Sequence, residues 1–203
     1  MGRVSAKLIS EFGKPVEVDR VSGLLVTLPG EHARIHEGYA FRVNLEVGTL
    51  AKDASVAYSF KTPSGVEIHL QNVVLSAANA DVAVEVWRGT TANPLTINSP
   101  GADDVSISGP YNLNDVLNTP SQVVIKKTPT YTGGEDGELW DKLFLPGAGS
   151  NQYQSVGVRA DSPYEEYMMK VDTYYVIKVT NTDGANAANG VNVRLFWYGR
   201  TPV

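Results

Sequence analysis

Two histidines stand at a spacing that could bind a metal ion. His32 and His36 lie four positions apart in the stretch EHARIHEG, and each has a glutamate beside it. On a helix this spacing suits zinc, because residues i and i+4 share one face. Pro29-Gly30 before the stretch and Gly38 after it disfavour a helix. We therefore predict no bound metal here, and no loss of function when both histidines are replaced by alanine.

The remaining groups give no catalytic pattern. His69 alternates with apolar residues in VEIHLQN, so we expect its side chain on the solvated face of a strand. The chain has no Cys and no G-x-S-x-G motif to support a nucleophile with a base. LPGAGSNQ contains two close glycines, but no strand–glycine loop–helix unit surrounds them. The sequence thus predicts that the protein is not an enzyme and has no catalytic or cofactor-binding residues.

Carboxylates cluster most densely in TGGEDGELWDK, where Glu135, Asp136 and Glu138 follow two glycines. Oxygen ligands close together in a glycine-rich loop could bind Ca²⁺, although the spacing is not that of an EF-hand. A solvated acidic turn is the alternative, and the sequence leaves the calcium question open. The adjacent pairs Asp103-Asp104 and Glu165-Glu166 would point apart within a strand.

Aromatic residues offer a different kind of site. Trp87, Trp140 and Trp197 stand far apart among ten Tyr and five Phe. A stacking platform for sugar is one interpretation, and core packing or anchoring of an interface is the more common one.

Charge and hydropathy limit the partners. The formal net charge is −5, and the longest basic run is Lys126-Lys127, whereas duplex binding needs a clustered basic face. No apolar stretch approaches the roughly 18 residues of a membrane span. Glu11 and Lys14 stand where a signal peptide would be apolar. We expect neither nucleic acid nor a membrane as partner, and the absence of Cys fits assembly in a reducing cytosol.

Most of the chain alternates apolar and polar residues with a period of two, which is typical of strands with one buried face. The clearest examples are AFRVNLEV, SVAYSFKT, VEIHLQN, DVAVEVW, YYVIKVTN and VNVRLFWYG. Turn signals such as Pro63-Ser64-Gly65 and Asp183-Gly184 separate them. The pattern predicts an all-β protein: an antiparallel β-sandwich of about eight strands, jelly-roll-like, forming a single domain over residues 16–203.

The last two runs make the strongest signal. We predict that Thr173–Thr180 and Val191–Tyr198 pair antiparallel, with Val193, Leu195 and Trp197 against the core. The connection around Asn186–Asn189 consists of small polar residues, so we expect it to be mobile. Phe196 and Tyr198 fall on the opposite face, which is either buried inside the sandwich or exposed to dock a partner.

Other stretches lack this pattern. Residues 139–154 suggest a long loop, and single helical turns are possible in Tyr111–Ser121 and Ser162–Lys170. Residues 1–15 lack sandwich patterning, and we expect an N-terminal arm that packs on a neighbouring subunit. Deleting residues 2–13 should then weaken the binding that this arm supports and spare the fold.

The order of several segments resembles a family of small tailed-bacteriophage virion proteins that decorate or cement the capsid. The resemblance runs from about Asp19 to Tyr198. It is carried by VDRVSGLLVTLPGEHARIHEGYAFRV, AYSFKTPSG, VEIHLQNVVLSAANADVAVEVWRG, EEYMMKVDTYYVIKVTN and VRLFWYG. Gly199 and Arg200 depart from the acidic end that the family would have.

The resemblance implies a non-catalytic decoration or cement protein that binds the outer surface of an icosahedral head and stabilises it. Its partner would be the major capsid protein, and it would itself be a homo-oligomer, a trimer or dimer, on the virion surface. The alternative is a carbohydrate- or receptor-binding β-sandwich module of a phage tail fibre or spike. A line of exposed aromatic residues beside polar groups in a groove would favour the alternative. A broad interface would favour the capsid protein.

Overall fold

The computed structural model describes residues 17–18, 25–26, 38–89, 95–105, 107–114, 120–132, 138–147, 153–159 and 167–200. Within these ranges every regular element is a β-strand, and every pairing between strands is antiparallel. The predicted all-β, antiparallel class is therefore confirmed. Fifteen strands are present in place of the eight expected, because short strands lie between the long ones.

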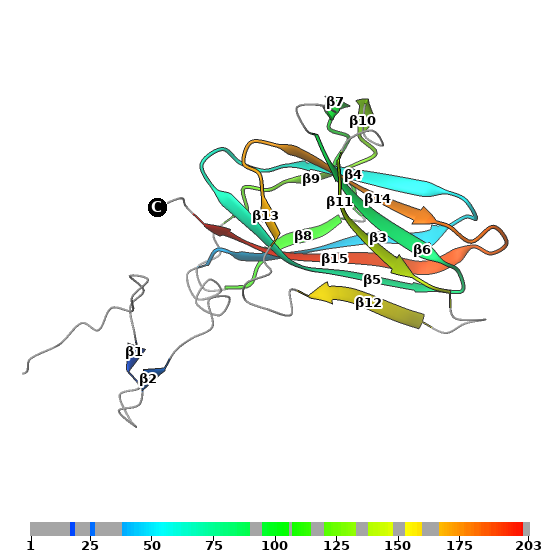
Figure 1. Cartoon of the computed structure of the whole chain (residues 1–203), viewed down its shortest axis with the longest axis horizontal. Coiled ribbons are helices and arrows are strands. Elements are labelled where there is room, and N and C mark those ends of the chain that lie inside the picture. Colours follow the sequence, from blue (N-terminus) through cyan, green and yellow to red (C-terminus); the bar gives the residue numbers. More distant parts are fainter. Residues whose placement is uncertain are drawn as a thin grey trace, which may run out of the picture.

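Two sheets form the body of the molecule (Figure 1). The five-stranded sheet has the order β11 (Glu138–Leu145), β6 (Val82–Arg88), β14 (Tyr174–Asn181), β4 (Ser55–Lys61), β9 (Ile125–Lys127). The six-stranded sheet has the order β12 (Tyr153–Arg159), β5 (Glu67–Ala78), β15 (Ala188–Arg200), β3 (Ala40–Leu50), β8 (Ile107–Asn112), and β13 (Tyr167–Met169) also pairs with β5. Two separate ribbons pair β1 (Glu17–Val18) with β2 (Leu25–Val26) and β7 (Thr96–Ser99) with β10 (Thr130–Thr132).

Four pairings between eight strands of the sandwich are nested. The strands β3, β4, β5 and β6 pair in turn with β15, β14, β12 and β11, so the first half of the sandwich meets the second half in reverse order. Successive strands along β3, β4, β5 and β6 also alternate between the two sheets. Two further pairings, β15 with β5 and β14 with β6, close each sheet around this long folded hairpin.

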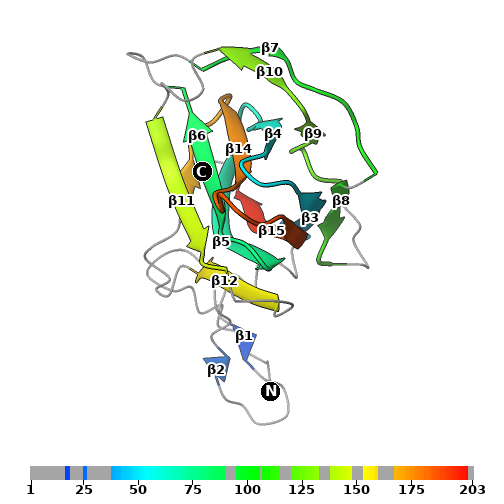
Figure 2. The same cartoon turned by 90° about the vertical axis from the view of Figure 1, so that its right-hand side faces the viewer.

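The core lies between the sheets and follows directly from the period-two pattern. Its members are contributed by alternate positions on the facing strands: Phe41, Val43 and Leu45 on β3, Tyr58 and Phe60 on β4, Val82, Val84 and Val86 on β6, Tyr175, Ile177 and Val179 on β14, and Val193, Leu195 and Trp197 on β15. The predicted inward positions of Val193, Leu195 and Trp197 are confirmed. Figure 2 views the two layers nearly end-on.

One strand changes its inward register midway. On β5, Ile68 and Leu70 face the core, and then Val73 and Leu75 do so, so that two residues rather than one separate the two sets. The pairing with β15 shifts at this point, because Trp197 lies opposite Leu70 while Phe196 lies opposite Asn72. This bulge divides β5 into a part that pairs with β13 and a part that pairs with β12.

The predicted terminal hairpin is wrong. The strand β14 pairs with β4 and β6 in one sheet, and β15 pairs with β3 and β5 in the other. A short connection can cross between packed sheets about 10 Å apart as readily as it can join neighbours. Sequence distance alone therefore did not distinguish the two arrangements.

The predicted loop over residues 139–154 is also wrong. Leu139–Leu145 lie in β11, and Leu143 and Leu145 are buried while Lys142 and Phe144 between and beside them are exposed. The alternation is present in DKLFL but short, because β11 is an edge strand with only one neighbour, β6. The predicted arm over residues 1–15 falls outside the described residues. Of the possible helical turns in Tyr111–Ser121 and Ser162–Lys170, residues 115–119 and 162–166 also fall outside them, and the described remainder contains no helix, since it includes the end of β8 and all of β13.

Candidate interaction surface

The outer face of the six-stranded sheet carries an unusual set of side chains. We define this surface, called here the open face, by the residues that alternate with the core residues of β3, β5, β8 and β15: Arg42, Asn44, Glu46, Asn72, Val74, Ser76, Tyr111, Asn192, Arg194 and Phe196. Arg42, Glu46, Arg194 and Tyr111 are exposed. The period of two that buries one set of residues necessarily presents this second set outward.

Register aligns these side chains into three rows across the strands. The first row is Tyr111, Arg42, Phe196 and Asn72, the second is Asn44, Arg194 and Val74, and the third is Glu46, Asn192 and Ser76. Directly opposed residues in an antiparallel pair have Cβ atoms about 5 Å apart. The first row therefore places Arg42 between Tyr111 and Phe196 of the two neighbouring strands, and the third row contains the acidic Glu46.

The charges of the open face are only partly satisfied within the chain. The Nε of Arg194 donates a hydrogen bond of 3.0 Å to Oδ1 of Asn44. In the part of the chain that the structure describes, the side chains of Arg42 and Glu46 have no hydrogen-bond or ion-pair partner. Both are on β3, four residues or about 13 Å apart along the strand, which is too far for them to pair with each other.

The open face ends in a buried aromatic pair. The rings of His69 and Tyr198 stack with their centroids 4.7 Å apart and their planes 11° apart. His69 is only 4% exposed, so the expected solvated histidine is wrong. The alternation correctly placed His69 away from the core, but Tyr198 on the neighbouring strand covers it. Sequence spacing could not reveal this cover, since the two residues are far apart in the chain.

The outer face of the five-stranded sheet, called here the paired face, differs in its charges. The Nζ of Lys142 lies 2.7 Å from Oε1 of Glu85. Lys61 forms an ion pair of 2.5 Å with Asp172, and this hydrogen bond is the main cause that raises the pKa of Lys61. Near its β9 edge, Lys126 pairs with Asp103 at 2.6 Å.

Apolar and covering contacts complete the paired face. Trp87 lies opposite Val176 and Leu139 by register, and Val176 is almost fully buried. The hydroxyl of Ser59 donates to the carbonyl of Pro100, which brings the segment after β7 over β4. In Figure 2 the ribbon formed by β7 and β10 lies at the top, above β14 and β4 of this sheet. Part of the paired face is therefore occupied by the chain itself.

At the edge of that sheet, Asp141 lies opposite Val86, whose side chain is in the core. Burial raises the pKa of Asp141, and a hydrogen bond from the backbone N–H of Lys142 partly offsets the rise. A carboxylate at an inward edge position discourages another strand from pairing there.

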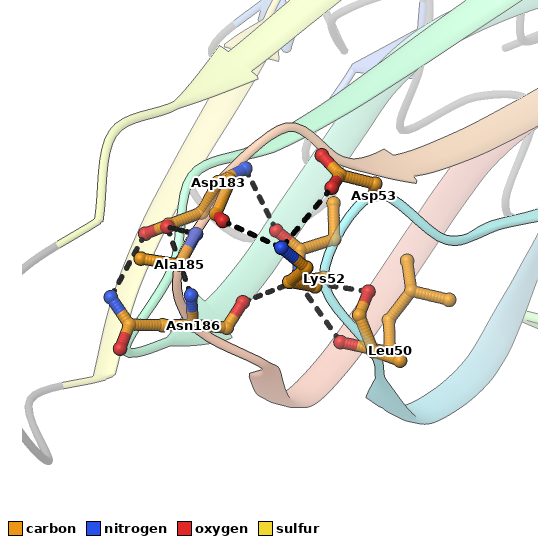
Figure 3. Close-up of polar contacts among 9 residues, drawn as sticks. Leu50, Lys52, Asp53, Asp183, Ala185 and Asn186 are labelled. Carbon is orange, nitrogen blue, oxygen red and sulfur yellow. Dashed lines mark hydrogen bonds and ion pairs between the residues drawn. The ribbon is translucent and has the colours of Figure 1, made fainter.

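The turns at one end of the sandwich are tied together by a buried amide (Figure 3). The Nδ2 of Asn181 donates to the carbonyls of Leu50, Ala51 and Asn186 at 2.9–3.1 Å, and its Oδ1 accepts from the N–H of Asp183. The Nζ of Lys52 also donates to the carbonyl of Gly184. This network joins the β3–β4 turn to the β14–β15 turn.

The same turn is closed by Asp183. Its carboxylate accepts hydrogen bonds from the backbone N–H groups of Ala185 and Asn186, in that order the largest causes that hold its pKa below the usual value. The strand β15 already begins at Ala188, so the connection is shorter than the predicted one. The small polar residues of the sequence therefore form a hydrogen-bonded turn in place of the loose linker that was expected.

Most of the candidate metal-binding residues fall outside the part of the chain that the structure describes. His32, His36, Glu135, Asp136, Glu165 and Glu166 fall outside the described residues, as does the side chain of Glu138. Asp103 and Asp104 point to different partners, Lys126 and Lys127, as expected for neighbours in a chain. Among the residues that the structure describes, no three His, Cys, Asp or Glu side chains come together.

The two tryptophans whose side chains the structure describes, Trp87 and Trp197, do not form one platform. Trp197 is in the core, where its ring packs 6.1 Å from that of Phe41, and Trp87 is on the paired face. A small apolar cavity of about 10 Å³ lies beside Trp197, lined by residues such as Phe60, Leu70, Ile125 and Met169. This volume is about that of one water molecule and is far below that of a metabolite pocket.

Comparison with known proteins identifies no relative: no family model and no curated protein matches the chain. In the described part of the chain there is also no helix of the length and apolarity needed to cross a membrane. The open face carries Arg42, Arg194 and the exposed ring of Tyr111, residue types that are common at protein interfaces.

Proposed function

We propose that this protein is a non-catalytic bacteriophage decoration or cement protein. It would bind the outer surface of an icosahedral head through contacts with the major capsid protein and stabilise the particle. The observation that carries the proposal is the open face, a sheet surface on which Arg42 and Glu46 have no side-chain partner among the described residues, and on which Arg42 lies between the exposed Tyr111 and the half-buried Phe196. Arg and aromatic residues are enriched at protein interfaces, where they supply much of the binding energy.

The strand order supports a jelly-roll sandwich. The strands β3, β4, β5 and β6 pair with the later strands β15, β14, β12 and β11 in reverse order, and two cross-pairings link these pairs within each sheet. This wiring is that of an eight-stranded double-sheet roll, an architecture frequent in viral capsid and lectin domains. One fold occurs in proteins of many functions, so the proposed function is inferred from the surface residues and not from the fold.

The rigidity of the sandwich also suits a particle subunit. Asn181 ties two turns together, and Thr62 does the same at the start of the β4–β5 connection, where its hydroxyl donates to the carbonyl of Lys170 at 2.6 Å. A stiff module loses little conformational entropy when it binds. Homo-oligomerisation as a dimer or trimer and the 1–15 arm are further parts of the proposal. They would multiply a weak contact through avidity.

The alternative is a carbohydrate- or receptor-binding module of a tail fibre or spike. Tyr111, exposed beside Arg42 and close to Asn44, is the observation that favours it, because sugars stack on aromatic rings and bond to planar polar groups. These residues lie on the outer surface of a sheet, and the cavity beside Trp197 is too small for a sugar. A flat surface fits a protein partner better than a small ligand.

Co-sedimentation with heads tests the proposal. Heads of the parent phage prepared without this protein are incubated with the purified chain and pelleted, and heads with and without it are then heated. We expect saturable binding at a fixed number of copies per head and a higher temperature of head disruption. Binding to a glycan array or to whole host cells, with none to heads, would replace the proposal by the alternative.

A further inference from the structure

We propose that the open face is the surface that meets the capsid, and that it recognises a protein surface of complementary polarity. That surface would place a carboxylate opposite Arg42 and a basic side chain opposite Glu46, about 13 Å apart. The inference rests on the proposed function. It adds to that function which side of the sandwich binds and what chemistry the partner must present.

The paired face and the open face differ in whether their charged side chains have partners within the chain. On the paired face, Lys142 and Lys61 lie within 2.7 Å of Glu85 and Asp172 respectively, so the chain already neutralises them. On the open face, Arg42 and Glu46 have no such partner among the described residues. Charges that a protein leaves unpaired on a folded sheet are available to a partner, and they set its orientation and its rate of association.

The charges of the open face lie in different rows of the sheet. Arg42 belongs to the row that also contains Tyr111 and Phe196, whereas Glu46 belongs to the row with Asn192 and Ser76. The open face is therefore positive and aromatic at one end and acidic at the other. A partner with the opposite order of charges fits in one orientation only, because rotation by 180° would bring like charges together.

The end of the open face that carries Arg42 and Arg194 offers hydrogen-bond donors suited to a carboxylate. A guanidinium presents a planar fork of donors that matches a carboxylate in two hydrogen bonds, and aromatic rings beside it exclude water from the contact. Arg194 in the next row is held toward Asn44 by its Nε, which leaves its terminal nitrogens to a second acceptor. A carboxylate-bearing protein surface satisfies both arginines, whereas a neutral sugar leaves both charges without a counter-ion.

Charge reversal on each end tests the proposal. The variants Arg42→Glu and Glu46→Lys are compared with wild type for binding to heads that lack the protein, at low and at physiological salt. The control is Lys142→Glu, a charge reversal at an exposed position on the paired face. Thermal denaturation of each variant checks that the sandwich remains folded.

We expect each open-face reversal to weaken head binding by about tenfold or more, with the larger loss at low salt. Lys142→Glu should bind within about twofold of wild type. The proposal is overturned when the open-face variants bind as wild type does, or when the control loses as much as they do.

Failure of the proposed function looks different. Wild type that does not bind heads at all removes both the function and this inference. Wild type that binds heads, with reversals that have no effect, removes the inference alone. A loss of glycan or cell binding in the reversals, with no head binding by wild type, would assign the open face to a receptor.

Discussion

Both outer faces of the sandwich consist of the side chains that alternate with core residues, but they differ in whether their charged side chains form ion pairs within the chain. Lys142 and Glu85 pair across β11 and β6, and Lys61 and Asp172 pair beside β14. Arg42 and Glu46 on β3 are left apart by four residues of a strand. The comparison shows that one outer face carries ion pairs formed within the chain, whereas Arg42 and Glu46 on the other face have no such partner among the described residues.

The largest expected effect separates the inner from the outer side of a single strand. Trp197→Ala should lower the free energy of unfolding by roughly 3–5 kcal/mol, because it removes a buried ring from the core. Phe196→Ala, the neighbouring change on the open face, should cost much less, since Phe196 is only half-buried. Chemical denaturation measures both. Equal losses would show that the open face is as tightly packed as the core.

The second-largest expected effect concerns the β3–β4 and β14–β15 turns, which connect strands of the two sheets. Asn181→Ala removes an amide that bonds to three carbonyls in a buried site, and even one buried polar group left unsatisfied costs about 1–3 kcal/mol. We expect a clear fall in melting temperature. Asn192→Ala on the open face is the control. An Asn181→Ala protein as stable as this control would contradict the role of the network in holding the turns.

A smaller effect sharpens the contrast between the faces. Lys142→Ala breaks an exposed ion pair and should cost about 0.2–1 kcal/mol, an effect that high salt should reduce. Arg42→Ala breaks no pair within the described chain, so its stability should stay within about 0.5 kcal/mol of wild type. Urea titrations at two salt concentrations make the comparison. A greater loss for Arg42→Ala would mean that the open face is not free.

The smallest effect is one of pH. The folded pKa of Asp183 is depressed by the N–H groups of Ala185 and Asn186, so its contribution to stability is present above the unfolded pKa of about 3.9. That contribution is lost as the pH falls through the lower folded value. Wild type should therefore exceed Asp183→Asn in melting temperature at pH 7, and the difference should shrink below about pH 4. A constant difference across this range would exclude the carboxylate charge as its cause.

Prediction from the sequence succeeded where it depended on local alternation. Phe41, Val43, Val84 and Leu195 all face the core as their spacing indicated. Edge strand β11 escaped notice because only Leu143 and Leu145 of it are clearly inward. The candidate surface was visible only in part. The sequence placed Phe196 and Tyr198 on one outward face, but the two differ in burial. Tyr198 is buried against His69, whereas Phe196 is half-exposed.

The sequence by itself determined which residues point in and which point out, because the pleat reverses the side chain at every residue. It determined the all-β class for the same reason. The tertiary structure decided which strands are neighbours, and hence that β14 and β15 lie in different sheets. It also decided which charges meet: Lys142 reaches Glu85 across 57 residues of chain, while Arg42 and Glu46, four residues apart, cannot touch. Pairing depends on distance in space, and that distance is set by the order of the strands.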